Sequence, residues 1–392
     1  MLQQQIDLSP DLKQLRDDGY EIEVKGGYLI VHHIPYVDSN RDIKLGKLIS
    51  TLLLNNDVTV RPDNHVINFM GEYPCNNDGS IITAIQHSAQ LNQPLFDGIT
   101  INFSFSNKPQ NGYNNYYEKV ARYAEIISAP AKSIDKTVTA KTFKVIADNA
   151  DETVFNYIDS NSSRANIYQL NSKFKGQRIA IIGLGGTGSY ILDLVAKTPV
   201  EEILLFDSDE FLQHNAFRAP GAASIETLNK RLKKVDYFAE IYSQMRRGIK
   251  PYSEKITEKN IELLRGLSYV FICIDSNSAK SMIISNLRNF GVTFIDAGLG
   301  VNLVDEYLIG QLRVTVGTPA KYDHIPNRIG SASMEDDEYA TNIQIADLNA
   351  LNALMAVIKW KKLSGFYQDL KQEFNSTYTI NTSQLINEDF IE

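Results

Sequence analysis

Residues 178–218 read RIAIIGLGGTGSYILDLVAKTPVEEILLFDSDEFLQHNAFR, and this stretch decides the fold. It opens with a β-branched run, Arg178–Ile182, which predicts a buried strand. A glycine-rich turn comes next, and a helix is expected over Leu192–Ala196, stopped near Pro199. The apolar run Ile203–Phe206 predicts a second strand. Strand, turn, helix and strand in this order predict an α/β, Rossmann-like, doubly wound domain.

The turn after the first strand has the composition of a phosphate-binding loop: Gly183, Gly185, Gly186, Thr187 and Gly188. Glycines let the chain turn tightly and let phosphate oxygens approach backbone N–H groups at a helix N-terminus. Asp207 ends the second strand, where a carboxylate can accept hydrogen bonds from ribose hydroxyls. These residues together predict a nucleotide site.

The class of nucleotide depends on the residues after Asp207. Residues 183–188 also satisfy the G-x-G-x-x-G fingerprint, so an NAD(P)-binding Rossmann oxidoreductase is an alternative. However, Asn215 and Arg218 come shortly after the second strand. A guanidinium group binds phosphate bidentately and never loses its charge, which favours a triphosphate over a dinucleotide.

The same residues resemble the ThiF/MoeB-type adenylyltransferases, the superfamily that includes the ubiquitin-activating enzymes. The pattern of that family is a GxGGxGS loop, a D-x-D strand end, an S-N-x-x-R turn, a helical lysine and a later strand that ends in aspartate. The matching positions here are Gly183–Ser189, Asp207, Asp209, Asn215–Arg218, Lys234 and Asp275. Lys230 and Lys233 remain alternatives to Lys234. The motifs cover roughly residues 164–363, and they are specific as a set but not singly.

The resemblance implies ATP-dependent adenylation of a carboxylate with release of pyrophosphate. The expected partner is a small ubiquitin-like or sulfur-carrier protein that ends in glycine. Because a carboxylate and a phosphate are both anions, the site must supply cations and a metal. Arg218 and Lys234 would neutralise the phosphates, and Asn215 would fix a phosphate oxygen. Asp275 would hold Mg²⁺, which binds through one or two carboxylates plus substrate phosphates.

The resemblance also implies a homodimer, in which Arg164 reaches the ATP of the other copy. A conjugating-type protein is a further expected partner. A non-catalytic family member that keeps the fold for partner binding is a third interpretation, and the set Asp207, Asn215, Arg218 and Asp275 argues against it.

Composition excludes several other classes of protein. The chain has 392 residues, a net charge of −8 and an isoelectric point near 5.4, which argues against non-specific nucleic-acid binding. No apolar run approaches the ~20 residues that cross a membrane, and the start, MLQQQIDLSPDLKQL, does not resemble a signal peptide. We therefore expect a cytoplasmic protein that binds neither nucleic acid nor membrane.

The chain has two cysteines, so the zinc site that many relatives build from two CxxC pairs is not expected. Cys273 lies in an apolar strand, where a thiol is usually a small hydrophobe. Cys75 lies in the loop GEYPCNNDG and is the candidate nucleophile for a thioester, although most loop cysteines are unreactive.

Three segments are expected: an α+β domain over residues 1–128 for partner binding or transfer, a connection over 129–163, and the adenylation domain over 164–392. The first domain resembles an N-terminal domain of bacterial ThiF-like proteins encoded beside ubiquitin-like partners, through HHIPYV, DNHVINFMGEYPC and FSFSNKPQNGY. Within it, Ile43–Leu54 is expected to be a helix.

Two features are expected late in the chain. Gly298 and Gly300 are placed at the substrate cleft. A helix over Ile343–Leu363 carries apolar residues on one side, and it is expected to pack in the core or in a dimer: Ile345, Leu348, Leu351, Met355 and Ile358.

Overall fold

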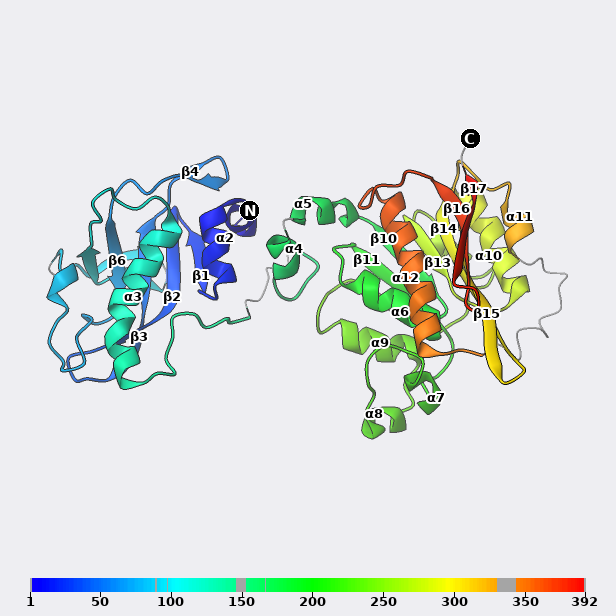
Figure 1. Ribbon diagram of the computed structural model, residues 1–392, viewed down its shortest axis with the longest axis horizontal. Helices are drawn as coiled ribbons and strands as arrows, with labels where there is room; N and C mark the ends of the chain where they lie inside the picture. Colours follow the sequence, from blue (N-terminus) through cyan, green and yellow to red (C-terminus); the bar gives the residue numbers. More distant parts are fainter. Residues whose placement is uncertain are drawn as a thin grey trace. The chain divides into compact units, whose positions relative to one another are not determined.

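The computed structural model describes residues 2–88, 90–96, 98–145, 153–165, 167–329 and 343–390. The chain divides into two compact units, one of residues 1–147 and 158–168 and the other of residues 148–157 and 169–392. Figure 1 shows their helices and strands, coloured along the sequence. Each unit has its own hydrophobic core. No helix in the described ranges is both long enough and apolar enough to cross a bilayer.

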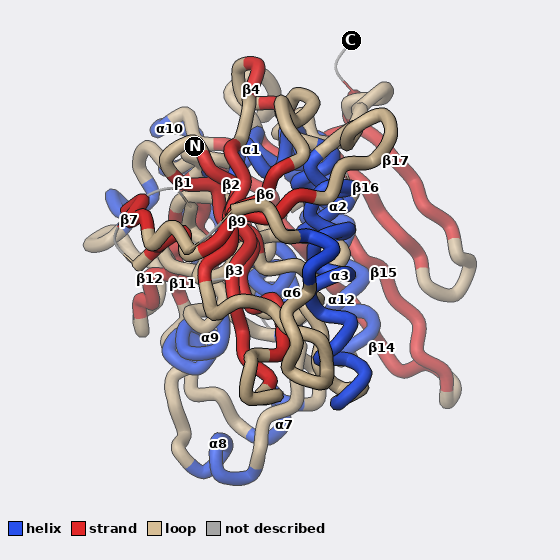
Figure 2. Tube along the Cα trace, turned by 90° about the vertical axis from the view of Figure 1, so that its left-hand side faces the viewer, coloured by secondary structure: helices blue, strands red, loops and turns tan. Residues whose placement is uncertain are grey.

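The first unit is an antiparallel sheet with helices on one face. The strands run in the order β1-β2-β3-β6-β9. The main elements are α1 (Leu2–Leu8), α2 (Pro10–Asp17), β1 (Ile22–Lys25), β2 (Tyr28–Val37), β3 (Ile43–Thr51), β6 (Val66–Met70), β9 (Phe103–Ser106), α3 (Tyr116–Ile134) and α4 (Ser160–Arg164). Two small hairpins accompany them, β4 (Leu54–Asn55) with β5 (Val58–Thr59), and β7 (Gln93–Phe96) with β8 (Ile99–Ile101). Figure 2 shows α2 and α3 beside the strands of the five-stranded sheet.

The prediction of a helix over Ile43–Leu54 is wrong, because residues 43–51 form strand β3 in the middle of the sheet. Both faces of β3 are covered: Leu48 packs into the core under α2 and α3, and Ile49 packs into a second cluster on the other face. A strand buried on both faces loses the polar–apolar alternation, so its pattern cannot be told from that of a buried helix. Only glycine has room at position 46 of β3, because a Cβ there would lie 2.3 Å from the ring of Phe69.

The second unit is built on a mixed sheet in the order β12-β11-β10-β13-β14-β15-β16-β17. Its strands are β10 (Arg178–Ile182), β11 (Glu202–Phe206), β12 (Ile249–Tyr252), β13 (Tyr269–Ile272), β14 (Thr293–Val304), β15 (Tyr307–Gly317), β16 (Glu373–Thr379) and β17 (Gln384–Phe390). The first five pair in parallel, and the last three add antiparallel strands. The expected doubly wound α/β architecture is therefore confirmed, with an antiparallel extension.

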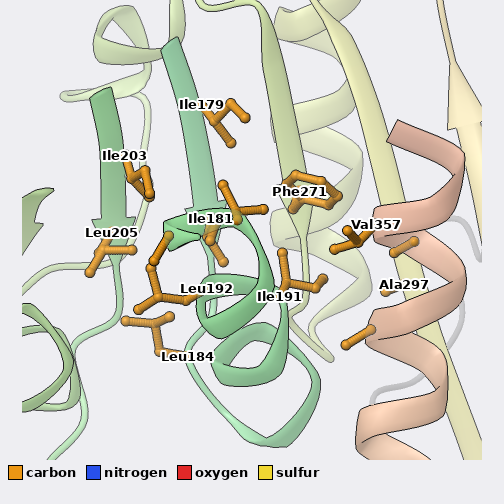
Figure 3. Close-up of a cluster of buried hydrophobic side chains, with 14 of the residues drawn as sticks. Ile179, Ile181, Leu184, Ile191, Leu192, Ile203, Leu205, Phe271, Ala297 and Val357 are labelled. Carbon is orange, nitrogen blue, oxygen red and sulfur yellow. The ribbon is translucent and has the colours of Figure 1, made fainter. Parts of the chain in front are cut away.

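Helices cover both faces of this sheet. The helices are α6 (Gly186–Ala196), α7 (Gln213–Ala216), α8 (Ile225–Asn229), α9 (Lys234–Tyr242), α10 (Asn277–Phe290), α11 (Ile325–Arg328) and α12 (Ala346–Leu363). The core of one face is made with α6, α9 and α12, and that of the other with α10 and α11. Figure 3 shows the first core, where side chains of α6 and α12 meet those of the central strands: Ile179, Ile181, Ile191, Leu192, Ile203, Leu205, Phe271, Ala297 and Val357.

The buried face of α12 differs from the expected one. Ile358, in the expected apolar stripe, is 44% exposed, while Asn349, Asn352 and Trp360 are buried. The expected stripe consists of the large aliphatic residues, but small and polar side chains let this helix lie closely on α6 and β14. The face of α12 toward the sheet is therefore partly polar.

The order of the central strands positions a crevice. β10 has β11 on one side and β13 on the other, and the helices that follow β10 and β13 lie on opposite faces. The chain therefore leaves the carboxyl ends of these two strands in opposite directions, which opens a crevice at that point. Ligands of doubly wound sheets bind at such a switch point.

One prediction concerns the stability of the first unit. Lys119 of α3 is fully buried, and its Nζ donates to the hydroxyl of Ser50 on β3 at 3.0 Å. Burial lowers the pKa of Lys119 from 10.5 to about 8. Between these values the unfolded chain binds more protons than the folded chain. The free energy of unfolding should therefore rise with pH in this window, by up to about 3 kcal/mol, and Lys119→Met should remove the rise.

Urea denaturation at several pH values measures this effect. Comparing wild type and variant at each pH cancels the contributions of the other titrating groups to the free energy of unfolding. Lys132→Met is the control, because Lys132 is an exposed lysine of the same helix. Parallel pH profiles for wild type and Lys119→Met would contradict the assignment.

Candidate nucleotide site

A cavity of about 530 Å³ opens at the carboxyl ends of β10, β11 and β13. This volume lies in the range typical of small-molecule sites. Most of the residues that the sequence predicted for the site line it: Gly183, Gly185, Gly186, Thr187, Asp207, Asp209, Arg218, Lys234 and Asp275. The parallel strands bring these residues together from positions almost a hundred apart in sequence.

The glycine loop is shaped by close backbone contacts. Gly183 has a φ of +89°, and a Cβ there would lie 2.5 Å from the carbonyl oxygen of Cys273. At Gly188 a Cβ would lie 1.9 Å from the carbonyl oxygen of Gly183, so this glycine serves packing and does not line the cavity. The loop leads directly into the N-terminus of α6, where free backbone N–H groups favour an anion.

Asp207 holds the glycine loop in place. One carboxylate oxygen accepts from the N–H of Leu184 at 2.7 Å, and the other accepts from the N–H of Asp209 at 2.9 Å. The Nζ atom of Lys234, on α9, lies 3.6 Å from a carboxylate oxygen of Asp207 and 2.8 Å from one of Asp209. Asp207 therefore already uses both oxygens within the protein, and its predicted contact to ribose stays a prediction.

Three cations line the cavity: Arg218, Lys234 and Lys255. The Nε atom of Arg218 is buried, and no group in the described residues accepts a hydrogen bond from it. The backbone of Arg218 is fixed, because its N–H donates to the carbonyl of Asn215 at 3.1 Å. A guanidinium with an unused donor, carried on an ordered turn beside the cavity, fits a phosphate group.

Asp275 lies just after β13 and remains accessible within the cavity. Desolvation by the surrounding protein atoms raises the pKa of its carboxyl group, while Lys280 and Arg218 act in the opposite direction. Within the described ranges, His, Cys, Asp and Glu side chains do not gather in threes as a metal cage. One accessible carboxylate beside a cavity lined by cations fits a Mg²⁺ ion that would arrive with a nucleotide.

Asn215 lies outside the cavity lining. It is 4% exposed, and its side-chain oxygen accepts from the N–H of Leu212 at 2.9 Å, which closes the turn at the start of α7. Its position indicates that it shapes the turn that carries Arg218.

Cys75 and Arg164 belong to the first unit. Arg164 donates to the carbonyl of Asp17 at 2.8 Å within that unit. Cys75 is 1% exposed, and burial together with the acidic neighbours Asp38 and Asp78 raises the pKa of its thiol. These surroundings disfavour a thiolate, which is the reactive form of cysteine. The catalytic role of Cys75 and the reach of Arg164 into another copy stay predictions.

Sequence reasoning missed Lys255, Gln344 and Asn349, which also line the cavity. Lys255 comes just after β12, so the rule that placed Asp207 after β11 could have found it. Asn349 is 1% exposed on α12, and its side chain accepts from the Thr187 hydroxyl at 3.3 Å and donates to the Arg218 carbonyl at 3.5 Å. A polar residue on the inner face of an apolar helix was the available signal.

Comparison with known proteins gives the family. A model described as the ThiF family matches residues 161–380. The chain belongs to the ThiF family. A second model, described as a domain of unknown function (DUF6791), matches residues 10–160. The resemblance predicted from the glycine loop and the acidic strand ends is therefore confirmed.

Curated relatives of this ThiF-family chain match over part of their length. Ubiquitin-like modifier-activating enzyme 5 of Drosophila ananassae is 21% identical over 156 residues, which are 37% of this chain and 39% of that protein. The protein of the same name from Rattus norvegicus is 21% identical over 147 residues, which are 35% of this chain and 36% of that protein. The chain thus spans well under half the length of these relatives.

Solved structures resemble the ThiF-family unit at low identity. E. coli MccB crystallised with ATP has a TM-score of 0.44 and 15% identity, covering 59% of this chain and 72% of that chain. E. coli TcdA, a tRNA N6-threonylcarbamoyladenosine dehydratase in complex with AMP, has a TM-score of 0.39 and 18% identity, covering 52% of this chain and 93% of that chain.

The contact between the loop and α12 can be tested by substitution. A Cβ at Gly186 would lie 1.9 Å from the side-chain nitrogen of Asn349. Gly186→Ala should therefore lower the melting temperature, with a cost of about 1–3 kcal/mol from overpacking. Adding Asn349→Ala should recover much of that loss, since it removes the clashing amide.

Gly185→Ala is the matched control, because the nearest heavy atom to its Cβ is 4.0 Å away, in Gln344. Thermal melts of the four proteins decide the point. Equal destabilisation by the two alanine substitutions would show that the Asn349 contact is not what restricts Gly186.

Proposed function

We propose that the second unit uses ATP to adenylate the carboxylate of a small protein or peptide partner, with release of pyrophosphate. The observation that carries the proposal is the cluster of Arg218, Lys234 and Lys255 around the glycine-loop cavity, opposite the accessible carboxylate of Asp275. A hydride-transfer site has no use for three cations at this position, whereas a triphosphate and a pyrophosphate leaving group need them. The NAD(P) alternative is therefore the weaker one.

In the proposed reaction, a carboxylate oxygen of the partner forms a bond to the α-phosphorus of ATP. The bond from that phosphorus to the bridging oxygen breaks, so that pyrophosphate leaves and an acyl adenylate remains. Arg218 and Lys234 lower the repulsion between the two anions and stabilise the negative charge that develops on the leaving group. The N–H groups at the start of α6 hold phosphate oxygens. Mg²⁺, held by Asp275, supplies further neutralisation of phosphate charge when it is bound.

A finer proposal concerns the partner, which we take to be a ubiquitin-like or carrier protein that ends in glycine. A second cavity, of about 490 Å³, is lined by Gly298, Gly300 and Gly310 on β14 and β15, and it shares Leu299 with the first. Glycines on its floor let a peptide backbone approach closely. The names of the curated relatives support this class of partner. The homodimer, a conjugating-type partner and the cytoplasmic location stay predictions.

The central prediction is the reaction itself. ATP–pyrophosphate exchange should require Mg²⁺ and a partner with a free terminal carboxylate. Asp275→Ala and Arg218→Ala should each reduce the exchange rate by about 10²–10³, the usual cost of losing one electrostatic contact in the transition state. Isotope exchange between pyrophosphate and ATP measures it directly.

The matched control is Arg265→Ala, because Arg265 pairs with Glu262 on the surface at 2.7 Å, away from the cavity. Its rate should equal that of the wild type. Wild-type exchange in Asp275→Ala would refute the role given to Asp275. Absence of exchange with every carboxylate partner, or preferential binding of NAD over ATP, would refute adenylation.

A separate prediction concerns the thiol. Because Cys75 is buried with a raised thiol pKa, Cys75→Ala should leave exchange unchanged. No thiol-reducible adduct between the protein and its partner should form in the wild type. Mass spectrometry of the reaction mixture, with and without a reducing thiol, tests this. An adduct that disappears in Cys75→Ala would make the first unit a transfer module.

A further inference from the structure

A buried ion cluster joins α10, β14 and β15 of the second unit. Asp296 on β14 is fully buried, and its two oxygens hold two cations. Lys280 Nζ of α10 lies 2.9 Å from one oxygen, and Arg313 of β15 lies 2.6 Å from the other. A fully buried carboxylate is costly unless it is paired, and this one is paired twice.

Each cation faces a different part of the molecule. Arg313 lines the second cavity and also donates to the carbonyl of Arg328. Lys280 closes the first turn of α10, because its N–H donates to the carbonyl of Ser276, the N-cap that directly follows Asp275 in the chain. One helical turn therefore separates the backbone of Lys280 from that of Asp275, so both side chains start from the same end of α10.

Strand register explains why Asp296 can hold Lys280. Ile272 at the end of β13 pairs with Asp296 on β14, so the chain that continues to Asp275 starts beside this carboxylate. Two carboxylates thus flank one buried lysine, and the pair actually formed is with Asp296. Arg313 occupies the second oxygen of Asp296 and fixes the orientation of the group.

We propose that Asp296 is a positioning residue that keeps the Lys280 ammonium away from Asp275, so that Asp275 stays available to the Mg²⁺ of the bound nucleotide. The proposal rests on the proposed function. Without the charge of Asp296, Lys280 loses the carboxylate that holds it, and Asp275 at the start of the same helix is an anion with which it can pair. An internal ion pair there would exclude the metal.

The test measures Mg²⁺-dependent binding of a fluorescent ATP analogue, with no partner protein present. Asp296→Asn should raise the Mg²⁺ concentration for half-maximal binding by about tenfold, since a close charge commonly changes such an equilibrium by at least that factor. Adding Lys280→Met should return it to the wild-type value, because the competing ammonium is then absent. A purely structural role for Asp296 predicts no such rescue.

Glu373→Gln is the matched control. Glu373 is another buried carboxylate of this unit that holds two cations, Lys359 at 3.5 Å and Lys362 at 2.8 Å, and it does not line the nucleotide cavity. Its Mg²⁺ requirement should stay at the wild-type value. A shift as large as that of Asp296→Asn would overturn the proposal, because the loss of an unrelated buried carboxylate would then have the same effect on the Mg²⁺ requirement.

The remaining outcomes also decide the matter. If Asp296→Asn binds with an unchanged Mg²⁺ requirement, or the double variant stays as weak as the single one, the inference is wrong. If circular dichroism shows that Asp296→Asn does not fold, Lys280→Met alone carries the test. It should need no more Mg²⁺ than the wild type, and a higher requirement would mean that Lys280 itself helps to bind the nucleotide. A wild type that does not bind the analogue refutes the proposed function instead.

Discussion

The carboxylate of Asp207 is the interaction on which the rest of the nucleotide site depends. It joins the glycine loop to the end of β11 through the N–H of Leu184, and it orders the next turn through the N–H of Asp209. Buried backbone N–H groups must find acceptors, and a loop made mostly of glycine cannot supply them with its own side chains. The same carboxylate lies 3.6 Å from Lys234, so the position of the first cation on α9 is tied to the loop as well. Loop, strand end and cation are thus fixed by one group.

The parts of the fold that could be predicted are those in which one local signal dominates. β10 and β11 are short apolar runs bounded by turn residues, and the glycines between them leave few conformations for the chain. The strand β3 could not be predicted because Leu48 and Ile49 are buried on opposite faces, which erases the two-residue period. The inner face of α12 could not be predicted because the packing selects small and amide side chains such as Asn349 over the larger aliphatic ones. Tertiary contacts decide both cases, and no window of sequence contains them.

For the site, the sequence predicts which residues come close together, but it does not predict which of their atoms already have partners. Sequence motifs predicted one site for Gly183, Arg218 and Asp275, and all three line one cavity, because residues after neighbouring parallel strands share one edge of the sheet. They could not tell which atoms the fold already uses. Asn215 commits its side-chain oxygen to the N–H of Leu212, whereas Arg218 keeps Nε without an acceptor among the described residues. An unused donor is a property of the folded chain, and it separates a side chain that stays available to a ligand from one that shapes the turn.

Buried lysines extend this reasoning to charge. Lys234 and Lys280 each have a carboxylate within 3 Å, and both lie beside the proposed nucleotide site. Lys119 in the first unit has a hydroxyl as its neighbour, so the protein loses stability there for as long as the lysine is protonated. A carboxylate close to a buried lysine stabilises the ammonium group, but it also cancels part of the positive potential that a ligand would meet. The cations best placed to act on a triphosphate are therefore those whose counter-charge is shared or exposed, and Lys234 meets this condition because Asp209 leaves 64% of its side chain in solvent. Solvent screens the attraction of Asp209. The second carboxylate, that of Asp207, is shared with two backbone N–H groups, which leaves Lys234 available for a phosphate oxygen in the proposed reaction.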